Sequence, residues 1–232
     1  MPAERLVRVL GLLVTGGAPG GRRLCEVAAQ VTEMSGAGVM LLSEDRPQAS
    51  LCSTDTVSAA IEEAQYTLGE GPCVDAHRQG TPIIEADLAA AGPSRWAAFS
   101  TCALDAGARA VFGFPVRIGT VRLGALNLYR DRPGALGDDQ QADALVMADV
   151  AASAILAAQS DGYPGELGVD LEADTHVWTV VHQAAGMVSI QLDIPVGDAL
   201  VRLRAHAFRT GRPASEVARD IVERRLHFDP GT

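Results

Sequence analysis

Hydrophobic residues recur every three or four positions in the last quarter of the chain, which predicts helices with one apolar face each. Short breaks at 193–195 and 211–213 divide this stretch into three segments. The apolar positions are Val177, Val180, Val181, Ala184, Met187, Val188 and Leu192 in the first, Leu200, Leu203 and Ala207 in the second, and Val217, Ala218, Ile221 and Val222 in the third. Helices this short are marginal alone in water. We therefore expect them to pack together as one small all-α unit, without room for an enzyme pocket.

The preceding region mixes helical and strand patterns and predicts a larger α+β domain over 22–160. Short apolar runs of strand length are bounded by turn residues, and Gly119-Thr120 joins two of them as a hairpin. The expected strands are 37–42, 48–53, 81–85, 108–118 and 121–129, and the expected helices are 22–34, 57–65 and one that begins near 137. An antiparallel sheet flanked by helices is the expected fold.

Two further segments complete the expected organisation. In residues 1–21, an amphipathic helix is predicted that packs on the sheet domain or pairs with a second copy of the chain; its apolar positions are Leu6, Val7, Leu10, Leu13 and Val14. Residues 161–173 are rich in glycine and proline, so we expect a linker that ends the last helix of the sheet domain. The helical unit then occupies 174–228.

Charge is distributed unevenly between these parts. The chain has a formal net charge of −10, and all 19 of its basic residues are arginine. Residues 1–175 carry a net charge of −11, from 12 arginines and 23 acidic residues, whereas 176–232 carry +1, from 7 arginines and 6 acidic residues. An anionic partner is therefore expected only at the helical unit. No apolar run reaches the length of a membrane span, and no signal peptide is recognised, so we expect a cytoplasmic protein without a membrane partner.

The four cysteines do not indicate a metal site or a redox motif. Cys25, Cys52, Cys73 and Cys102 lack Cys-x-x-Cys spacing, and in a reducing cytosol buried, free thiols are the default expectation. We expect no bound metal, no cofactor and no catalytic residues, because no nucleophile–base pair and no glycine-rich nucleotide loop appears. A thiol reductase acting on a sulfoxide remains an alternative that the cysteines permit.

The sheet region resembles a GAF domain, a sensor module for small molecules. The resemblance is carried by Leu68–Cys73, Gly80–Ile84 and the hairpin 111–129, with Phe114–Val116 and Gly124–Asn127 within it. It implies an antiparallel sheet with helices on one side and a ligand pocket on the other. The start of a helix near Cys73 could hold an anion. Candidate pocket residues are Cys73, Asp75, Trp96, Phe99 and Cys102; alternatively, Trp96 and Phe99 simply fill the pocket.

The last quarter of the chain resembles the ANTAR domain, the RNA-binding unit of bacterial transcription antitermination regulators. The matching positions are Ala184, Gly186, Ala199, Leu203, Arg204, Ala207, Val217 and Ala218. One departure is Ala185, where that family usually has a lysine. The resemblance implies binding to RNA hairpins, and the candidate RNA-binding residues are Arg202, Arg204, His206, Arg209, Arg212 and Arg224. An ordinary solvated helix face is the alternative interpretation of these residues.

Together these patterns predict a cytoplasmic, homodimeric sensor-regulator that binds RNA hairpins to control transcription termination. A ligand or a partner protein at the GAF-like domain would modulate this binding. The alternative is a degenerate GAF–ANTAR protein that acts as a dimerisation or protein-interaction module and binds no RNA.

Overall fold

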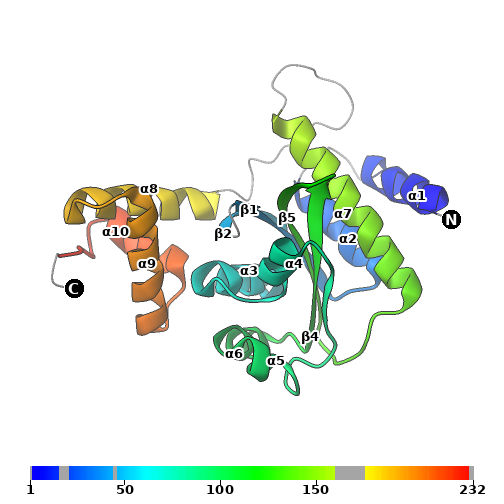
Figure 1. Ribbon diagram of the computed structural model, residues 1–232, viewed down its shortest axis with the longest axis horizontal. Helices are drawn as coiled ribbons and strands as arrows, with labels where there is room; N and C mark the ends of the chain where they lie inside the picture. Colours follow the sequence, from blue (N-terminus) through cyan, green and yellow to red (C-terminus); the bar gives the residue numbers. More distant parts are fainter. Residues whose placement is uncertain (1, 16–20, 44–45, 160–175, 230–232) are drawn as a thin grey trace. The chain divides into compact units, whose positions relative to one another are not determined.

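The computed structural model describes residues 2–15, 21–43, 46–159 and 176–229 (Figure 1). The chain divides into two compact units, Met1–Asp174 and Thr175–Thr232, which are described separately below. The predicted linker at 161–173 lies outside the described residues.

An antiparallel sheet of five strands forms the centre of the first unit. Its order is β2-β1-β5-β4-β3. The strands are β1 (Gly36–Ser43), β2 (Arg46–Ser53), β3 (Ile83–Glu85), β4 (Ala110–Ile118) and β5 (Val121–Arg130). The hairpin between β4 and β5 turns at Gly119, whose φ of 58° is a left-handed conformation that glycine adopts without strain. The predicted antiparallel sheet and its hairpin are confirmed.

Helices cover both faces of this sheet (Figure 1). On one face lie α2 (Gly21–Thr32) and α7 (Asp138–Gln159), and on the other lie α3 (Thr56–Leu68) and α4 (Pro72–Gln79). Two further helices, α5 (Gly92–Arg95) and α6 (Ala97–Ala106), follow β3. The antiparallel sheet with flanking helices that the resemblance implies is confirmed, and α3 and α4 lie against the sheet on the side of the implied pocket. Successive strand residues point to opposite faces, and here both faces are apolar: Phe112 belongs to one buried cluster and Val111 to the other.

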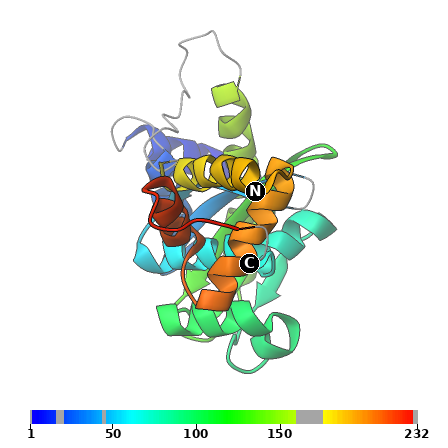
Figure 2. The same cartoon turned by 90° about the vertical axis from the view of Figure 1, so that its left-hand side faces the viewer.

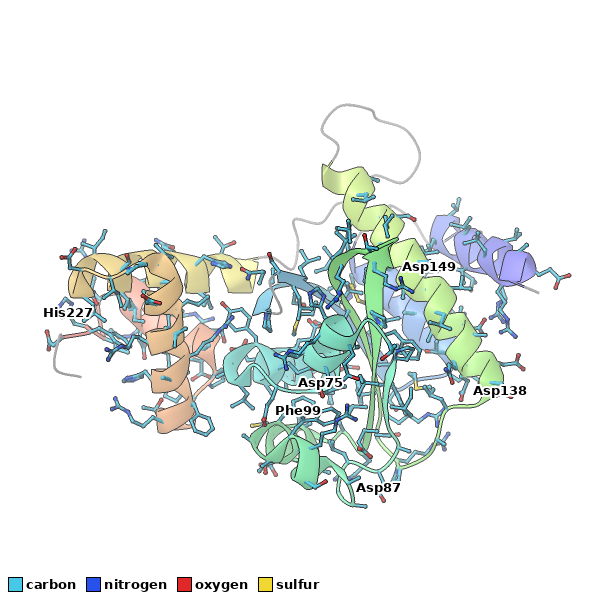
Figure 3. All side chains as sticks on the ribbon, in the orientation of Figure 1. Asp75, Asp87, Phe99, Asp138, Asp149 and His227 are labelled. Atoms are coloured by element: carbon cyan, nitrogen blue, oxygen red, sulfur yellow. A yellow bond between two sulfur atoms is a disulfide. The ribbon has the colours of Figure 1, made fainter. Side chains whose placement is uncertain are left out.

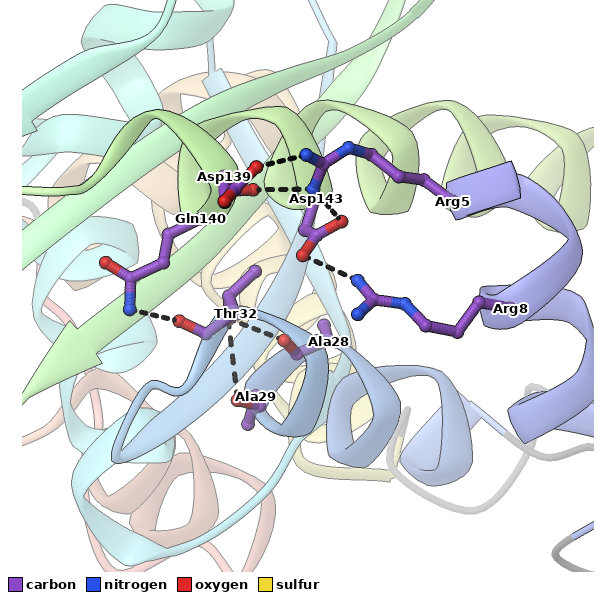
Figure 4. A network of polar contacts seen from close by, with 8 residues as sticks. All are labelled: Arg5, Arg8, Ala28, Ala29, Thr32, Asp139, Gln140 and Asp143. Atoms are coloured by element: carbon purple, nitrogen blue, oxygen red, sulfur yellow. Dashed lines mark hydrogen bonds and ion pairs between the residues drawn. The ribbon is translucent and has the colours of Figure 1, made fainter. Parts of the chain in front are cut away.

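The N-terminal helix α1 (Pro2–Val14) packs on α2 and α7. The predicted helix exists, and Leu13 and the partly buried Leu10 of its predicted apolar face pack on the core. The buried Val9 was not predicted, whereas Leu6, Val7 and Val14 of the predicted face are exposed. Ion pairs fix the register of the contact (Figure 4). Arg5 and Arg8 both reach the buried Asp143 of α7, at 2.8 and 2.6 Å, and Arg5 also pairs with Asp139.

The same part of α7 also contacts α2: Gln140 donates a hydrogen bond of 3.0 Å to the carbonyl oxygen of Thr32, the last residue of α2 (Figure 4). The Thr32 hydroxyl is itself bonded back to Ala28 at 2.6 Å. Polar contacts thus join α7 both to the start of the chain and to the end of α2.

A disulfide bond joins Cys25 of α2 to Cys52 of β2, with a Cα–Cα distance of 6.2 Å that lies within the normal range. The expectation of free thiols is therefore wrong for these two residues. They are 27 positions apart in the chain, so their spacing carried no signal. Cys73 and Cys102 are free.

The second unit consists of α8 (His176–Leu192), α9 (Val196–Thr210) and α10 (Ala214–Val222). In Figure 2 the three helices are seen from a second side. The chain bends by 105° between α8 and α9, and Gly211, with a φ of 63°, ends α9 in a left-handed conformation. The fully buried residues are Val181, Ala184, Ala185 and Val188 of α8, Ala199, Leu203 and Ala207 of α9, and Ala214, Val217, Ala218 and Ile221 of α10. These agree with most of the predicted apolar positions.

Within the described residues, no individual helix combines the length and apolar character needed to cross a membrane; the bent pair α8 and α9 reaches them only when the two helices are taken together, by length and composition alone.

Candidate functional site

A tight turn leads the chain from α3 into α4. Gly69 has a φ of 67° and Gly71 a φ of 130°, conformations that residues with a Cβ rarely adopt. The backbone N–H of Cys73 then donates a hydrogen bond of 2.7 Å to Oε1 of Gln65 on α3. The proposed anion site at this helix start is therefore not formed by the amide of Cys73, because a side chain of the protein already supplies its acceptor.

Two of the predicted pocket residues, Asp75 and Trp96, contact each other directly. The indole N–H of Trp96 donates to a carboxylate oxygen of Asp75 at 3.0 Å. Arg95 pairs with the same carboxylate at 3.2 Å and places its guanidinium 4.5 Å from the centre of the Trp96 ring. Asp75 of α4 thereby anchors the residue pair at the junction of α5 and α6.

The third member of this group is Phe99, which lies below Asp75 in Figure 3. The rings of Trp96 and Phe99 meet edge to face, with centres 5.9 Å apart. Both side chains are buried in one apolar cluster with Ile61, Leu88 and Val111. The two rings are therefore part of the apolar core of the first unit.

The cysteines among the predicted pocket residues do not join that group. Cys73 is wholly buried in a different apolar cluster with Met40, Leu42, Val74 and Ala125. Its burial, followed by the charge of Glu62, raises the pKa of the Cys73 thiol far above its ordinary value. Cys102 is exposed on α6, and partial burial also raises its pKa. Neither residue has the depressed pKa that makes a cysteine a good nucleophile.

A group of buried polar side chains that the sequence patterns did not predict lies on the α3–α4 side of the sheet. We call Ser50, Glu62, Gln65 and Asn127 the buried polar cluster. Ser50 of β2 donates a hydrogen bond to the carboxylate of Glu62 on α3, and Gln65 is the acceptor for Cys73 described above. Asn127 comes from β5, the central strand of the sheet.

Two glycines make room for this cluster. In the strand register Asn127 pairs with Gly38 on one side and with Gly113 on the other. A Cβ on Gly38 would collide with the carboxylate of Glu62, and a Cβ on Gly113 would collide with the backbone of Pro72 and Cys73. The Asn127 side chain thus rises from the sheet between an acidic side chain and the start of α4.

Hydrogen-bonding capacity in the cluster is incompletely used. Within the described part of the chain, neither amide atom of Asn127 has a hydrogen-bond partner, and the amide nitrogen of Gln65 has none either. Buried polar groups are nearly always paired, so such an exception calls for an explanation. The sequence did contain a signal for Asn127, because this polar residue interrupts the apolar run from Ala125 to Leu128. In the structure its side chain is fully buried. The cluster therefore contains a buried donor and acceptor of Asn127 and a buried donor of Gln65 that are not used within the described residues.

The predicted RNA-binding residues divide into two sets. In the first, Arg202 and Arg209 are exposed and lie seven positions apart on α9, so they share one side of that helix. Arg209 donates a hydrogen bond of 3.2 Å to Nδ1 of the half-buried His206. Burial, and then the charges of Arg209 and Arg212, lower the pKa of His206. His206 is therefore a neutral hydrogen-bond acceptor that orients Arg209. Arg204 is half-buried on the same helix.

The second set is Arg212 and Arg224, of which Arg212 engages acidic residues of the same unit. Arg212 pairs with Asp220 of α10 at 2.7 Å and with Glu216 at 3.6 Å. Arg225 pairs with the other oxygen of Asp220 at 2.7 Å. These two hydrogen-bonded guanidinium groups hold the pKa of Asp220 below its usual range. Arg212 is thus bound into the unit, while Arg224 is exposed in the turn after α10 with a φ of 58°.

The position at which the resembling family has lysine is interior in this chain. Ala185 is fully buried in the second unit. A lysine at this position would have to extend its ammonium group out of the packed interior to reach solvent. The arginines of this unit lie on α9, between α9 and α10, on α10 and after it, and none lies on α8. Among the described residues, no three His, Cys, Asp or Glu side chains are grouped to hold a metal ion.

Comparison with known proteins places this geometry in a family. Residues 21–156 match the GAF domain family. The GAF domain of a phosphoenolpyruvate-protein phosphotransferase from Acinetobacter aligns with 69% of this chain and 96% of its own length, at 13% identity and a TM-score of 0.50. The corresponding domain from Coxiella burnetii aligns with 69% of this chain and 98% of its own length, at 14% identity and a TM-score of 0.50.

At this level of identity the two structures show a shared fold and nothing further. No curated protein matches the chain significantly. The family match includes all five strands and the helices α3 and α4, which carry or contact the residues of the buried polar cluster. Because it covers more than half of the sequence, this chain belongs to the GAF domain family.

Proposed function

We propose that this chain is a cytoplasmic sensor-regulator that binds RNA hairpins through its second unit to control transcription termination. Membership of the GAF family indicates ligand sensing and signal transduction. The proposal adds an output to that sensing role. In this view a ligand or a partner protein at the first unit changes the affinity of the second unit for RNA, as in the antitermination regulators that the sequence resembles.

The observation that carries the RNA proposal is the concentration of cations on one exposed helix. The first unit is strongly acidic, yet α9 contains Arg202, Arg204 and Arg209 against the single acidic residue Asp198. Arg202 and Arg209 point away from the buried row of that helix. Phosphate contacts by such side chains supply much of the affinity of proteins for nucleic acids.

The RNA proposal is tested by binding of the full chain to hairpins with randomised loops, followed by a salt titration of the tightest hairpin. Replacing both Arg202 and Arg209 with glutamine should weaken binding and flatten the dependence of log affinity on log salt by about 1.5, since each lost phosphate contact removes about 0.7–0.9. The matched control is Arg117→Gln with Arg132→Gln, two exposed arginines of the first unit. An equal effect of the control pair, or no salt-sensitive binding by the unaltered chain, would refute the proposal.

For the sensing half, the buried polar cluster is the proposed ligand site. Its unsatisfied amide groups are what a polar ligand would pair with, and an unpaired buried polar group costs about 1–3 kcal/mol in a protein without ligand. Retaining such a group against stability is typical of a functional site.

This ligand site predicts opposite effects for two neighbouring substitutions. Asn127→Leu should raise the free energy of unfolding of the unliganded protein by about 1 kcal/mol, because it removes two unpaired polar atoms. Gln65→Met should lower it by a similar amount, because Cys73 loses its acceptor. Urea denaturation measures both. If Asn127→Leu destabilises the protein as much as Gln65→Met does, the amide of Asn127 is satisfied without a ligand.

We propose no catalytic role for the cysteines. A thiol reductase needs a reactive thiolate, whereas the pKa values of Cys73 and Cys102 are both raised and Cys52 is in a disulfide. Reductase activity that disappears in Cys73→Ser or Cys102→Ser would overturn this proposal.

A second candidate function, a dimerisation or protein-interaction module, is favoured by the exposed apolar residues of α1. Leu6, Val7 and Val14 are 40%, 71% and 72% exposed. A homodimer formed through α1 would bury them. Light scattering and a pulldown with the full chain, combined with the hairpin-binding measurement, separate the two candidates, because an interaction module forms a stable assembly without RNA and binds no hairpin.

A further inference from the structure

One row of α9 is apolar although it faces away from the core. Val201, Ala205 and Phe208 are spaced four and three positions apart, so they lie on one side of the helix. All three residues are exposed, and Phe208 is 61% exposed. The row lies opposite Ala199, Leu203 and Ala207, which are fully buried. Phe208 therefore contributes little to the packing of the second unit.

Arginines border this row on both sides. Arg202 and Arg209 each follow a member of the row by one position, and Arg204 lies three after Val201 and four before Phe208. The hydrogen bond from Arg209 to His206 holds that guanidinium close to the helix surface. An aromatic ring flanked by cations suits a partner that is anionic and also carries flat apolar faces.

The structure assigns to Phe208 the stacking of an unpaired base in an RNA loop, with the flanking arginines on the neighbouring phosphates. This inference rests on the proposed RNA-binding function and specifies its recognition site. Bases in single-stranded loops are splayed out and can stack on aromatic side chains while arginines neutralise the backbone. An acidic protein that docked here through apolar contacts would bury the row, but it would not need an aromatic residue at position 208.

The test compares Phe208→Leu with Phe208→Trp in the full chain, using the tightest hairpin from the randomised-loop selection. Leucine keeps most of the apolar area without a π face, whereas tryptophan keeps the π face. Loss of one stacked base should weaken binding roughly 5- to 150-fold in Phe208→Leu and leave the salt slope unchanged. Phe208→Trp should bind within about threefold of the unaltered chain. Ile190→Ala, at an 85% exposed apolar position of α8, is the matched control.

A second readout follows the base itself. A hairpin with the fluorescent base 2-aminopurine in its loop should be quenched by the unaltered chain and by Phe208→Trp, but not by Phe208→Leu. If Phe208→Leu binds and quenches like the unaltered chain while the Arg202 and Arg209 substitutions flatten the salt slope, RNA binding stands and the stacking assignment is wrong. A pulldown with the unaltered chain and with Phe208→Leu tests for a protein partner of the row. If Phe208→Leu binds RNA like the unaltered chain and loses only a protein partner in that pulldown, the row is a protein contact and the stacking assignment is wrong. If no hairpin binds the unaltered chain with salt sensitivity, both proposals fall.

Discussion

Replacing both Cys25 and Cys52 with alanine should lower the free energy of unfolding of the first unit by about 3.5 kcal/mol. The disulfide closes a loop between residues 27 apart, and this cross-link restricts the unfolded chain in proportion to the logarithm of the loop length. It also ties α2 to β2, an edge strand of the sheet. Chemical denaturation followed by the fluorescence of Trp96, in a Trp178→Phe background, reports on the first unit.

The control for this prediction is Cys102→Ala, because Cys102 is exposed and free. This substitution should change the free energy of unfolding by no more than about 0.5 kcal/mol. Reduction of the unaltered protein should reproduce the loss seen in the double variant. Thiol titration after denaturation without reductant should find the free residues Cys73 and Cys102. If all four cysteines react under those conditions, or if the double variant is as stable as the unaltered chain, the disulfide does not hold this unit together.

The second large effect is expected for Gly113→Ala, which should destabilise the first unit by about 3 kcal/mol. A Cβ at this position would lie 2.6 Å from the carbonyl carbon of Pro72 and 3.0 Å from the amide nitrogen of Cys73. Both are backbone atoms at the start of α4, so the helix must move away from the sheet. Overpacking of a close contact costs about 1–3 kcal/mol and more where the backbone cannot yield.

Movement of α4 would also strain the hydrogen bond from Cys73 to Gln65 and open the buried polar cluster. Gly11→Ala is the matched control, since a Cβ there meets nothing within 4 Å and α1 gains a better helix former. Urea denaturation measures both variants. Equal stability of Gly113→Ala and the unaltered chain would mean that α4 does not press on β4 as described.

The sequence predicted the elements whose signal is local. The hairpin at Gly119 and the apolar stripes of α8, α9 and α10 follow from periodicity and turn residues alone. The predicted strand at 81–85 proved to be shorter, Ile83–Glu85. The burial of Ala185, where the resembling family has lysine, required the packing of three helices.

What could not be predicted depends on contacts between distant segments. The Cys25–Cys52 bond needs α2 and β2 side by side. The role of Gln65 needs the turn at Gly71, and the position of Asn127 between Gly38 and Gly113 needs the strand register. For α1, the burial of Val9 in place of Val7 and Val14 needs the contact with α7, where Arg5 and Arg8 pair with Asp143.

The central claim is that α9 binds RNA in the cell, and sequencing the RNA that is cross-linked to the native chain tests it most directly. The account predicts enrichment of hairpins that overlap transcription terminators, and loss of that enrichment when Arg202 and Arg209 are replaced with glutamine. Recovery of no RNA above background, or of the same RNA from the unaltered and the substituted chain, would contradict it.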